Sequence, residues 1–260
     1  MIIYLFAVLE ATFVHADQIL TNPLASDGFG SQFRAIIYSV IYSEMTNKQF
    51  VYTPFVSMEH NYGYDVKFLE KKEELINFIN NFEINKDMNA TPLSQPELVY
   101  FFENHSNFVA ESKSLKKIKA IFRENKNKLN LFNPKRFNVA IHLRRPNPHD
   151  NRIEGTDIPD DVYLKIIKFF RNAYAPEHPL FHIYSQGEVE IFQKIYQGDD
   201  IIFHIDESIE NTFTSMVLAD VLVIGASAFS YAAGMLSEGK VYYFIDYHKP
   251  LPNWIKFNLD

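Results

Sequence analysis

Two adjacent arginines follow a strongly apolar segment in the second half of the chain. Val139–Leu143 runs directly into Arg144 and Arg145, and the side chain of His142 alternates with that of Arg144 on the same face of a strand. Ligands of open parallel sheets bind beyond the carboxyl ends of the strands. Guanidinium groups are permanently charged, planar donors that suit phosphate oxygens. The pattern therefore predicts an anion site, with surface ion pairs to acids of the following loop as the alternative. Those acids are Asp150, Glu154 and Asp157.

A glycine-containing turn in the first half offers a second candidate for ligand binding. Residues 27–32 read Asp-Gly-Phe-Gly-Ser-Gln and lie between a strand and a helix. Gly28 and Gly30 let the backbone approach a ligand closely, and a helix start presents unpaired N–H groups to an anion. The third glycine of a dinucleotide-binding fingerprint is absent. A plain tight turn is therefore the competing interpretation.

Small hydroxyl residues follow a third apolar segment. The strand expected at Val221–Gly225 is followed by Ser227, Phe229 and Ser230, which open a helix. A serine at this position can cap the helix and present N–H and O–H groups to a phosphate. Capping alone, without a ligand, is the alternative.

The composition and the missing motifs narrow the function further. The chain has 260 residues, no cysteine and a formal net charge of −7, which argues against a general nucleic-acid binder and excludes thiolate chemistry. No Asp-x-Asp, phosphate-binding Walker loop or Gly-x-Ser-x-Gly sequence occurs. His178 and His182 have the spacing of a two-histidine metal face, but Pro179 disfavours the helix it needs. We therefore expect no metal and no cofactor.

The second half alternates between strands and helices. Its strands are continuous apolar runs, which indicates a parallel sheet covered on both faces. The expected strands are Phe137–Leu143, Leu180–Ser185, Asp200–Ile205, Val221–Gly225 and Val241–Asp246. The expected helices are Val162–Tyr174, Glu188–Tyr196, Glu210–Ala219 and Phe229–Ser237.

The first half also reads as α/β, with fewer strands and longer loops. The expected elements are a strand ending near Pro23, a helix at Ser31–Met45, a strand at Gln49–Phe55, and helices at Val66–Asn80 and Lys113–Leu129. Asn133-Pro134 is the predicted domain boundary, which gives domains 1–134 and 135–260.

The N-terminal residues 1–16 are apolar and carry no Lys or Arg ahead of the apolar run. This favours a buried strand at Ile2–Val8 over a signal peptide or membrane anchor, and no other stretch reaches membrane-spanning length without charge. We therefore expect no firm membrane span and a cytoplasmic protein, with the signal or anchor as the alternative.

A run of basic residues precedes the predicted boundary. Between Lys113 and Arg136 the chain has nine Lys and Arg residues and one acid, Glu124. A solvated helix face is the favoured interpretation, and a basic surface near an anionic ligand is the alternative.

Taken together and in order, the three candidate segments resemble motifs of the fucosyltransferase-like glycosyltransferases of the GT-B fold. Residues 28–32 resemble that clan's Gly-x-Gly-x-Gln turn, residues 141–145 are similar to its His-x-Arg-Arg motif, and residues 227–231 are similar to the Ser-Ser-Phe-Ser-aromatic motif of the α-1,2 branch. The resemblance covers about residues 19–246. The chain also resembles exostosin-like glycosyltransferases of algae and large DNA viruses, which would place it in a host-cell cytoplasm if it is viral.

The resemblance implies an α/β, GT-B-like enzyme with two Rossmann-like domains and parallel sheets on either side of a cleft. The N-terminal domain would take a glycan or glycoprotein acceptor, and the C-terminal domain would hold a nucleotide-sugar donor, with a GDP-sugar favoured over a UDP-sugar. The implied reaction is an inverting, metal-independent transfer, with fucose the favoured sugar. The residues implied in donor binding are Gly28, Gly30, His142, Arg144, Arg145, Ser227, Phe229 and Ser230.

The catalytic base is the open question in this interpretation. Arg144 would stabilise the leaving diphosphate, while Asp150, its loop neighbour His149, or Asp27 beside the glycine turn could accept the acceptor's proton. Residues 58–62 are a candidate acceptor lip, with a packed surface loop as the alternative. Three other functions remain open: a UDP-sugar-dependent exostosin-like transferase, an inactive nucleotide or sugar binder, and a different Rossmann-type enzyme that acts on a phosphorylated substrate.

Overall fold

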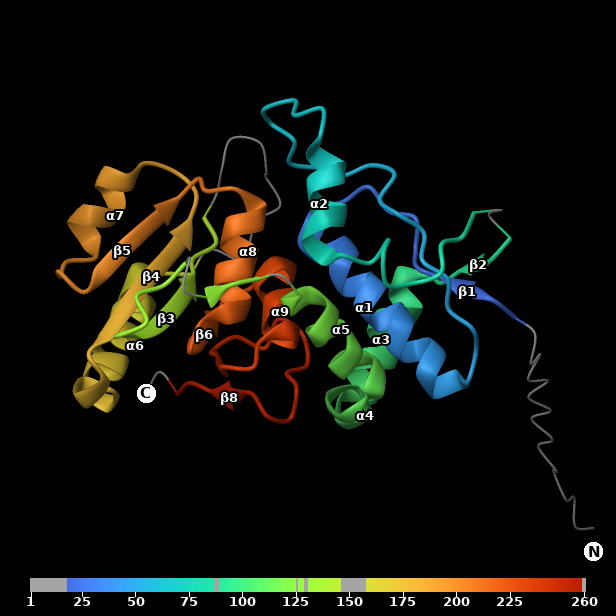
Figure 1. Cartoon of the computed structure of the whole chain (residues 1–260). Coiled ribbons are helices and arrows are strands. Elements are labelled where there is room, and N and C mark those ends of the chain that lie inside the picture. The colour runs from blue at the N-terminus through green and yellow to red at the C-terminus, as the bar shows by residue number, and fades with distance from the viewer. Residues whose placement is uncertain (1–17, 87–88, 125, 129–130, 146–157, 259–260) are drawn as a thin grey trace, which may run out of the picture.

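The structure is a computed structural model that describes residues 18–86, 89–124, 126–128, 131–145 and 158–258 (Figure 1). The strand or signal segment expected within residues 1–16 lies outside these residues, as do Asp150 and His149. The α/β class with parallel strands predicted from the sequence is confirmed.

A six-stranded parallel sheet forms the second half. Its strands are β3 (Phe137–His142), β4 (Pro179–Ser185), β5 (Ile201–Ile205), β6 (Val221–Ile224), β7 (Lys240–Tyr243) and β8 (Ile255–Lys256). Their order across the sheet is β5-β4-β3-β6-β7-β8, so the chain builds outward from β3 in one direction and then restarts at β6 in the other. This is the doubly wound 3-2-1-4-5-6 order, and its switch point lies between β3 and β6.

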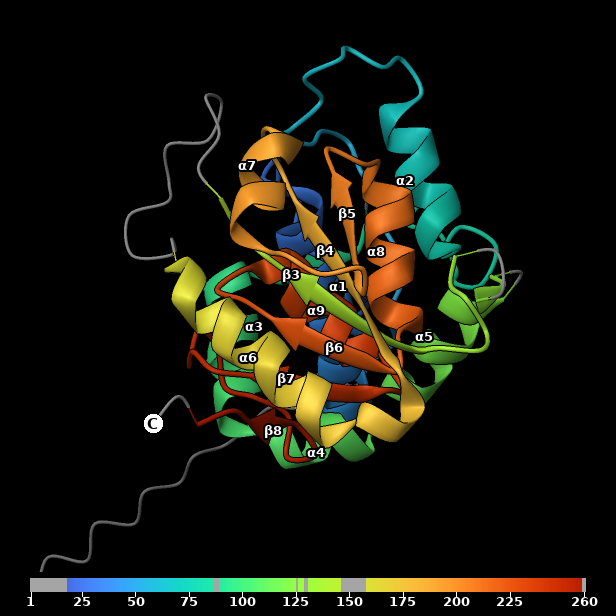
Figure 2. The ribbon, with the colours of Figure 1, turned by 90° about the vertical axis from the view of Figure 1, so that its left-hand side faces the viewer.

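The alternation of apolar side chains along β3 and β6 explains why both faces of the sheet are covered. Val139 and Val221 pack into a cluster with α6 (Asp160–Ala173), whereas Ala140 and Leu222 belong to the core on the opposite face. Figure 2 shows α6 on one face of the sheet and α1 and α9 on the other. The remaining helices of this half are α7 (Val189–Ile195), α8 (Ile209–Leu218) and α9 (Ala228–Leu236).

The first half contains a smaller set of parallel strands. Strand β1 (Leu20–Thr21) pairs with β2 (Thr91–Pro92), and isolated parallel bridges join Leu20 to Phe50 and Tyr52 to Ile84. The strand expected at Gln49–Phe55 is thus reduced to two bridged positions before Pro54. A proline cannot donate to a sheet ladder, so it ends the pairing there.

Five helices surround these strands, and a shared core joins the two halves. They are α1 (Phe29–Thr46), α2 (Phe68–Ile76), α3 (Gln95–Asn104), α4 (Ser106–Glu111) and α5 (Lys113–Arg123). Phe29 and Phe33 of α1 pack in one hydrophobic cluster with Phe213 of α8 and with Trp254, which lies just before β8. In Figure 1, α1 and α9 lie next to each other, between the six-stranded sheet and α3.

Helices α3 and α4 were not predicted from the sequence. Ser94 caps α3 by accepting a hydrogen bond from the Glu97 backbone N–H, and its hydroxyl donates to the Glu97 carboxylate at 2.7 Å. Ser94 and Glu97 have the Ser-x-x-Glu spacing of a capping box. Within the described residues, no helix has the length and apolar character needed to span a bilayer.

Candidate functional site

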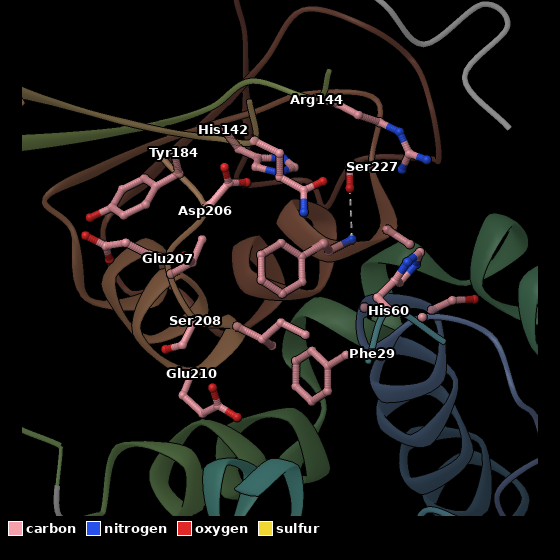
Figure 3. Close-up of a pocket in the computed structure, with 18 of the residues that line it drawn as sticks. Phe29, His60, His142, Arg144, Tyr184, Asp206, Glu207, Ser208, Glu210 and Ser227 are labelled. Carbon is pink, nitrogen blue, oxygen red and sulfur yellow. Dashed lines mark hydrogen bonds between the residues drawn. The ribbon is translucent and has the colours of Figure 1, made fainter. Parts of the chain in front are cut away.

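A pocket of about 690 Å³ opens at the switch point of the large sheet (Figure 3). Its walls come from both halves of the chain: the carboxyl ends of β3, β4 and β5 and the start of α9 on one side, and the start of α1 and the loop after Phe55 on the other. Open parallel sheets bind their ligands in this crevice. The pocket therefore occupies the position that the topology predicts for a ligand.

Of the three expected donor-binding residues at the start of α9, two line the pocket and one does not. Ser227 is the N-cap, and its Oγ accepts a hydrogen bond from the Phe229 N–H at 3.2 Å (dashed in Figure 3). Ser227 and Phe229 line the pocket. Ser230 is fully buried, its Oγ lies 3.4 Å from the Ser227 carbonyl oxygen, and it is not part of the pocket wall.

His142 lies at the end of β3, next to Phe229, with ring centroids 5.7 Å apart. Burial, with a smaller contribution from the charge of Arg144, lowers the pKa of His142 to about 4, so its ring is neutral near pH 7. Its Nδ1 atom is buried and has no hydrogen-bond partner within the described chain. Because buried polar atoms are normally hydrogen-bonded, this nitrogen is a point at which a ligand can bind.

The two arginines after β3 take different positions. Arg144 reaches into the pocket on the same side as Ser227 (Figure 3). Arg145 also borders the pocket, but its guanidinium forms an ion pair with Asp160 and donates to the Ile158 carbonyl at 2.9 Å. Arg145 therefore holds the start of α6 against β3. For this arginine the alternative interpretation given above, a surface ion pair, describes what the structure shows, and its described partner is Asp160.

The glycine turn brings the first half against α9. A Cβ atom added to Gly30 would lie 2.5 Å from the Phe229 backbone nitrogen, and one added to Gly28 would lie 2.8 Å from the His60 ring. At Gly30 the obstacle is backbone, which cannot move aside as a side chain can. This glycine is therefore required for the starts of α1 and α9 to meet at the pocket.

Gln32 fixes the turn to the neighbouring loop. Its buried amide Nε2 donates to the Asp27 carbonyl at 2.6 Å and to the Ser57 carbonyl at 3.0 Å. The side chain of Asp27 lines the pocket, and its Oδ1 atom is buried with no hydrogen-bond partner in the described structure. Asp27 thus presents a carboxylate from the wall opposite His142.

Part of the expected acceptor lip lines the pocket. His60, Asn61 and Tyr62 form part of its wall, and His60 Nδ1 lies 2.5 Å from the Tyr62 hydroxyl. The backbone of His60 is left-handed, with φ 73°, and the Glu59 N–H donates to the Ser26 carbonyl. The lip is therefore held against the glycine turn by both Gln32 and its own backbone.

Several pocket residues were missed by the sequence analysis. Arg34, one turn into α1, is only 6% exposed, donates through Nη1 to His248 Nε2, and has a buried Nε with no partner in the described structure. An acidic group after β5 lies across the pocket from Arg144. Its members are Asp206, Glu207 and Glu210 (Figure 3).

The acid nearest α2 is already neutralised. Lys72 of α2 is 2% exposed and pairs with Glu210 at 2.5 Å. Among the described residues, no group of three or more histidine and acidic side chains is arranged to hold a metal ion.

Three residues of the basic run before β3 bind the C-terminal ends of helices. Lys119, Arg123 and Lys126 donate to carbonyl oxygens at the C-terminal ends of α9, α8 and α2, at 2.9, 3.3 and 2.8 Å. Carbonyl groups at helix C-termini lack intrahelical partners and carry partial negative charge. These three cations therefore serve the fold, and none of them lines the pocket.

Comparisons with known proteins give structural similarities without sequence relatives. No protein-family model matches the chain, and no curated protein matches it. The fucosyltransferase NodZ from Bradyrhizobium is 10% identical, with a TM-score of 0.44 over 89% of this chain and 96% of that one. The E. coli heptosyltransferase WaaC with ADP is 9% identical, with a TM-score of 0.43 over 92% and 90%. A structure of NodZ α-1,6-fucosyltransferase soaked with GDP-fucose has a TM-score of 0.42.

The two proteins named here are a fucosyltransferase and a heptosyltransferase. At this level of similarity the comparison assigns neither a family nor an activity to this chain.

Proposed function

We propose that this chain is an inverting, metal-independent glycosyltransferase that moves a sugar, with fucose favoured, from a nucleoside-diphosphate sugar to a glycan hydroxyl. The observation that carries the proposal is the pocket at the switch point between β3 and β6, where a doubly wound sheet binds nucleotides. Arg144 supplies the cation at that point, and Ser227 begins a helix whose N-terminus favours phosphate.

The same residues suit the leaving group of this reaction. Attack of the acceptor oxygen on the anomeric carbon breaks the bond to the β-phosphate, and that electron pair leaves with the nucleoside diphosphate. Arg144 and the start of α9 both line the pocket, so they can stabilise the charge that develops on the β-phosphate. Neutral His142 lies beside Phe229 in the first turn of α9, so it can contact a nucleotide bound there.

Asp27 is the described residue best suited to accept the acceptor's proton. It lies on the wall opposite β3, and one carboxylate oxygen is buried without a partner. A carboxylate in this position can take the proton as the new glycosidic bond forms. Asp150 remains the other candidate base and lies outside the described residues.

Calorimetric titration with GDP and with UDP, each with and without a chelator, tests the donor. The proposal expects micromolar binding of one nucleotide, unchanged by the chelator, followed by transfer or hydrolysis of the matching nucleotide sugar. Preference for UDP would indicate the exostosin-like alternative. Binding without any turnover would indicate an inactive binder, and no affinity for either nucleotide would overturn the proposal.

Asp27→Asn separates catalysis from donor binding. If Asp27 is the base, turnover falls at least a hundredfold, the magnitude typical of a positioned base, while nucleotide affinity is retained. Asp150→Asn is the matched variant. Loss of turnover in Asp150→Asn alone would move the role of base to Asp150.

A further inference from the structure

A chain of four side chains, joined by three hydrogen bonds, runs from inside the large sheet to the acidic side of the pocket. His182 on β4 contacts Asn138 on β3 through Nε2 at 3.2 Å and His204 on β5 through Nδ1 at 3.0 Å. His204 Nδ1 then lies 2.7 Å from Oε1 of Glu207. Glu207, at the end of this chain of side chains, lines the pocket.

The amide of Asn138 sets the direction of these hydrogen bonds. Its Nδ2 atom faces three acceptors: the Arg136 carbonyl at 2.8 Å, the Asn133 carbonyl at 3.2 Å and the Asp220 carboxylate at 3.4 Å. The amide nitrogen must therefore lie on that side, and Oδ1 faces His182. Because Oδ1 only accepts, His182 Nε2 carries a hydrogen.

Buried His182 is neutral, and this determines the direction of its hydrogen bond with His204. Burial and the neighbouring charge of His204 lower the pKa of His182 to about 3. With its hydrogen on Nε2, neutral His182 accepts at Nδ1, so His204 donates through its own Nε2. The short contact between His204 Nδ1 and Glu207 then needs one more hydrogen. This hydrogen bond joins the His204 ring to the Glu207 carboxyl group.

The surroundings hold this pair in one orientation. The Tyr184 ring stacks on His204 with centroids 4.5 Å apart, and Phe132 packs edge-on against His182. Asp206, with φ 54°, turns the chain sharply after β5 and brings Glu207 back onto His204. Within the described structure, the bond from His204 is the one hydrogen bond that Glu207 makes.

We propose that His182 and His204 are positioning residues that hold Glu207 in one orientation, so that its carboxylate accepts hydrogen bonds from the ribose hydroxyls of the donor nucleotide. This inference rests on the proposed function. Figure 3 places Arg144 and Ser227 on one side of the pocket and Glu207 with Tyr184 on the other, with His142 between them. A nucleotide whose diphosphate lies at Arg144 therefore extends its ribose toward the β4 and β5 side of the sheet.

Titration with GDP and UDP and with their 2′-deoxy counterparts tests the contact. Wild type is expected to bind the ribonucleotide roughly 10- to 100-fold more tightly than its deoxy counterpart, the value of a hydrogen bond to a charged group. Glu207→Gln should reduce this ratio to about one by weakening the ribonucleotide alone. Glu190→Gln, the same change on exposed Glu190 of α7 outside the pocket, should leave the ratio intact.

His204→Phe tests the positioning role, because phenylalanine keeps an aromatic ring that can stack on Tyr184 but lacks both ring nitrogens. The affinity ratio should fall while affinity for the deoxy nucleotide is retained, whereas a merely structural role would weaken both nucleotides equally. Imidazole ¹⁵N shifts of the wild type should show neutral His182 with its hydrogen on Nε2.

Three results would overturn the inference: a wild-type ratio near one, a ratio unchanged in Glu207→Gln, or a ratio unchanged in His204→Phe. These failures are distinct from failure of the proposed function, in which wild type binds neither GDP nor UDP and the ribose contact fails with it.

Discussion

The two ends of helices α2, α8 and α9 are used in opposite ways. Residues in the first turn of each helix line the pocket: Phe68 in α2, Glu210 in α8 and Ala228 in α9. At the other ends, α5 and the residue Lys126 just after it provide a cation for a C-terminal carbonyl of each helix. The N–H ends of three helices therefore face a cavity, while their carbonyl ends are bound to protein cations.

This difference shows why the density of basic residues is a poor guide to an anion site. The segment richest in Lys and Arg compensates helix C-termini, whereas Arg144 and Arg34 stand at the pocket with few basic neighbours in sequence. Partial positive charge at the N-termini of α8 and α9 adds to these two arginines. The anion site that we propose at the pocket depends on how the helices are aligned, and a local count of charges does not detect alignment.

The largest expected effect is at the pocket end. Arg144→Ala should raise the barrier to sugar transfer by about 2–4 kcal/mol, as the loss of a fixed donor to a developing anion does. Steady-state turnover measures this, and Arg136→Ala, at the opposite end of β3, is the control, since it bonds to the His178 and Pro179 carbonyls. Near-normal turnover in Arg144→Ala would remove the arginine from the catalytic role.

The junction of α1 and α9 should be the next most sensitive point. Gly30→Ala forces a methyl group onto the Phe229 backbone and is expected to lower the free energy of unfolding by about 1–3 kcal/mol, with weaker nucleotide binding. Gly63→Ala is the matched control, because an added Cβ there meets nothing within 4 Å. Equal stability of the two variants in urea titrations would show that the helix starts are not tightly joined.

A smaller effect is expected at the carbonyl ends. Lys119→Gln removes the charged donor to the Ser237 carbonyl and should cost about 1 kcal/mol of unfolding free energy. Lys116→Gln alters an exposed lysine that lies 3.8 Å from exposed Glu111, and should change stability by less than about 0.5 kcal/mol. Similar losses in both variants would indicate that net charge, and not the helix end, is responsible.

The last prediction is a pH dependence of stability at Lys126. Burial lowers the pKa of Lys126 to about 8 in the folded protein, below its ordinary value of 10.5. Between these values the unfolded chain binds the proton and the folded chain does not, so stability rises with pH across this window. The stability of wild type relative to Lys126→Met should therefore increase from pH 8 to pH 10 in urea titrations. A flat difference would place Lys126 in contact with solvent.

The second half could be predicted from the sequence because local pattern and fold agree there. Strands β3, β4 and β6 are largely apolar and buried, whereas the edge strand β5 is only partly buried. In contrast, the capping box at Ser94 and Glu97 was a local sign of α3 that the analysis missed. Recognising this box would have located the helix.

The pocket could be predicted only in part. His142, Arg144, Ser227 and the glycine turn carry local motifs, and the structure brings them to one cavity. Arg34 and Glu207 carry no such pattern. Arg34 contacts His248, which is far away in the sequence. Glu207 contacts His204 three residues before it, and His204 in turn contacts His182 on the neighbouring strand β4, so both positions depend on contacts between distant segments.

The shared core gives the molecule a built-in optical probe. Trp254 is the one tryptophan in the sequence, and its ring lies 4.8 Å from that of Tyr231 in the core that both halves contribute to. Its emission can be excited apart from the fifteen tyrosines. Parting of the two halves would admit water to this ring and shift its fluorescence to longer wavelength, so union of the halves can be followed in the unlabelled, unmodified protein.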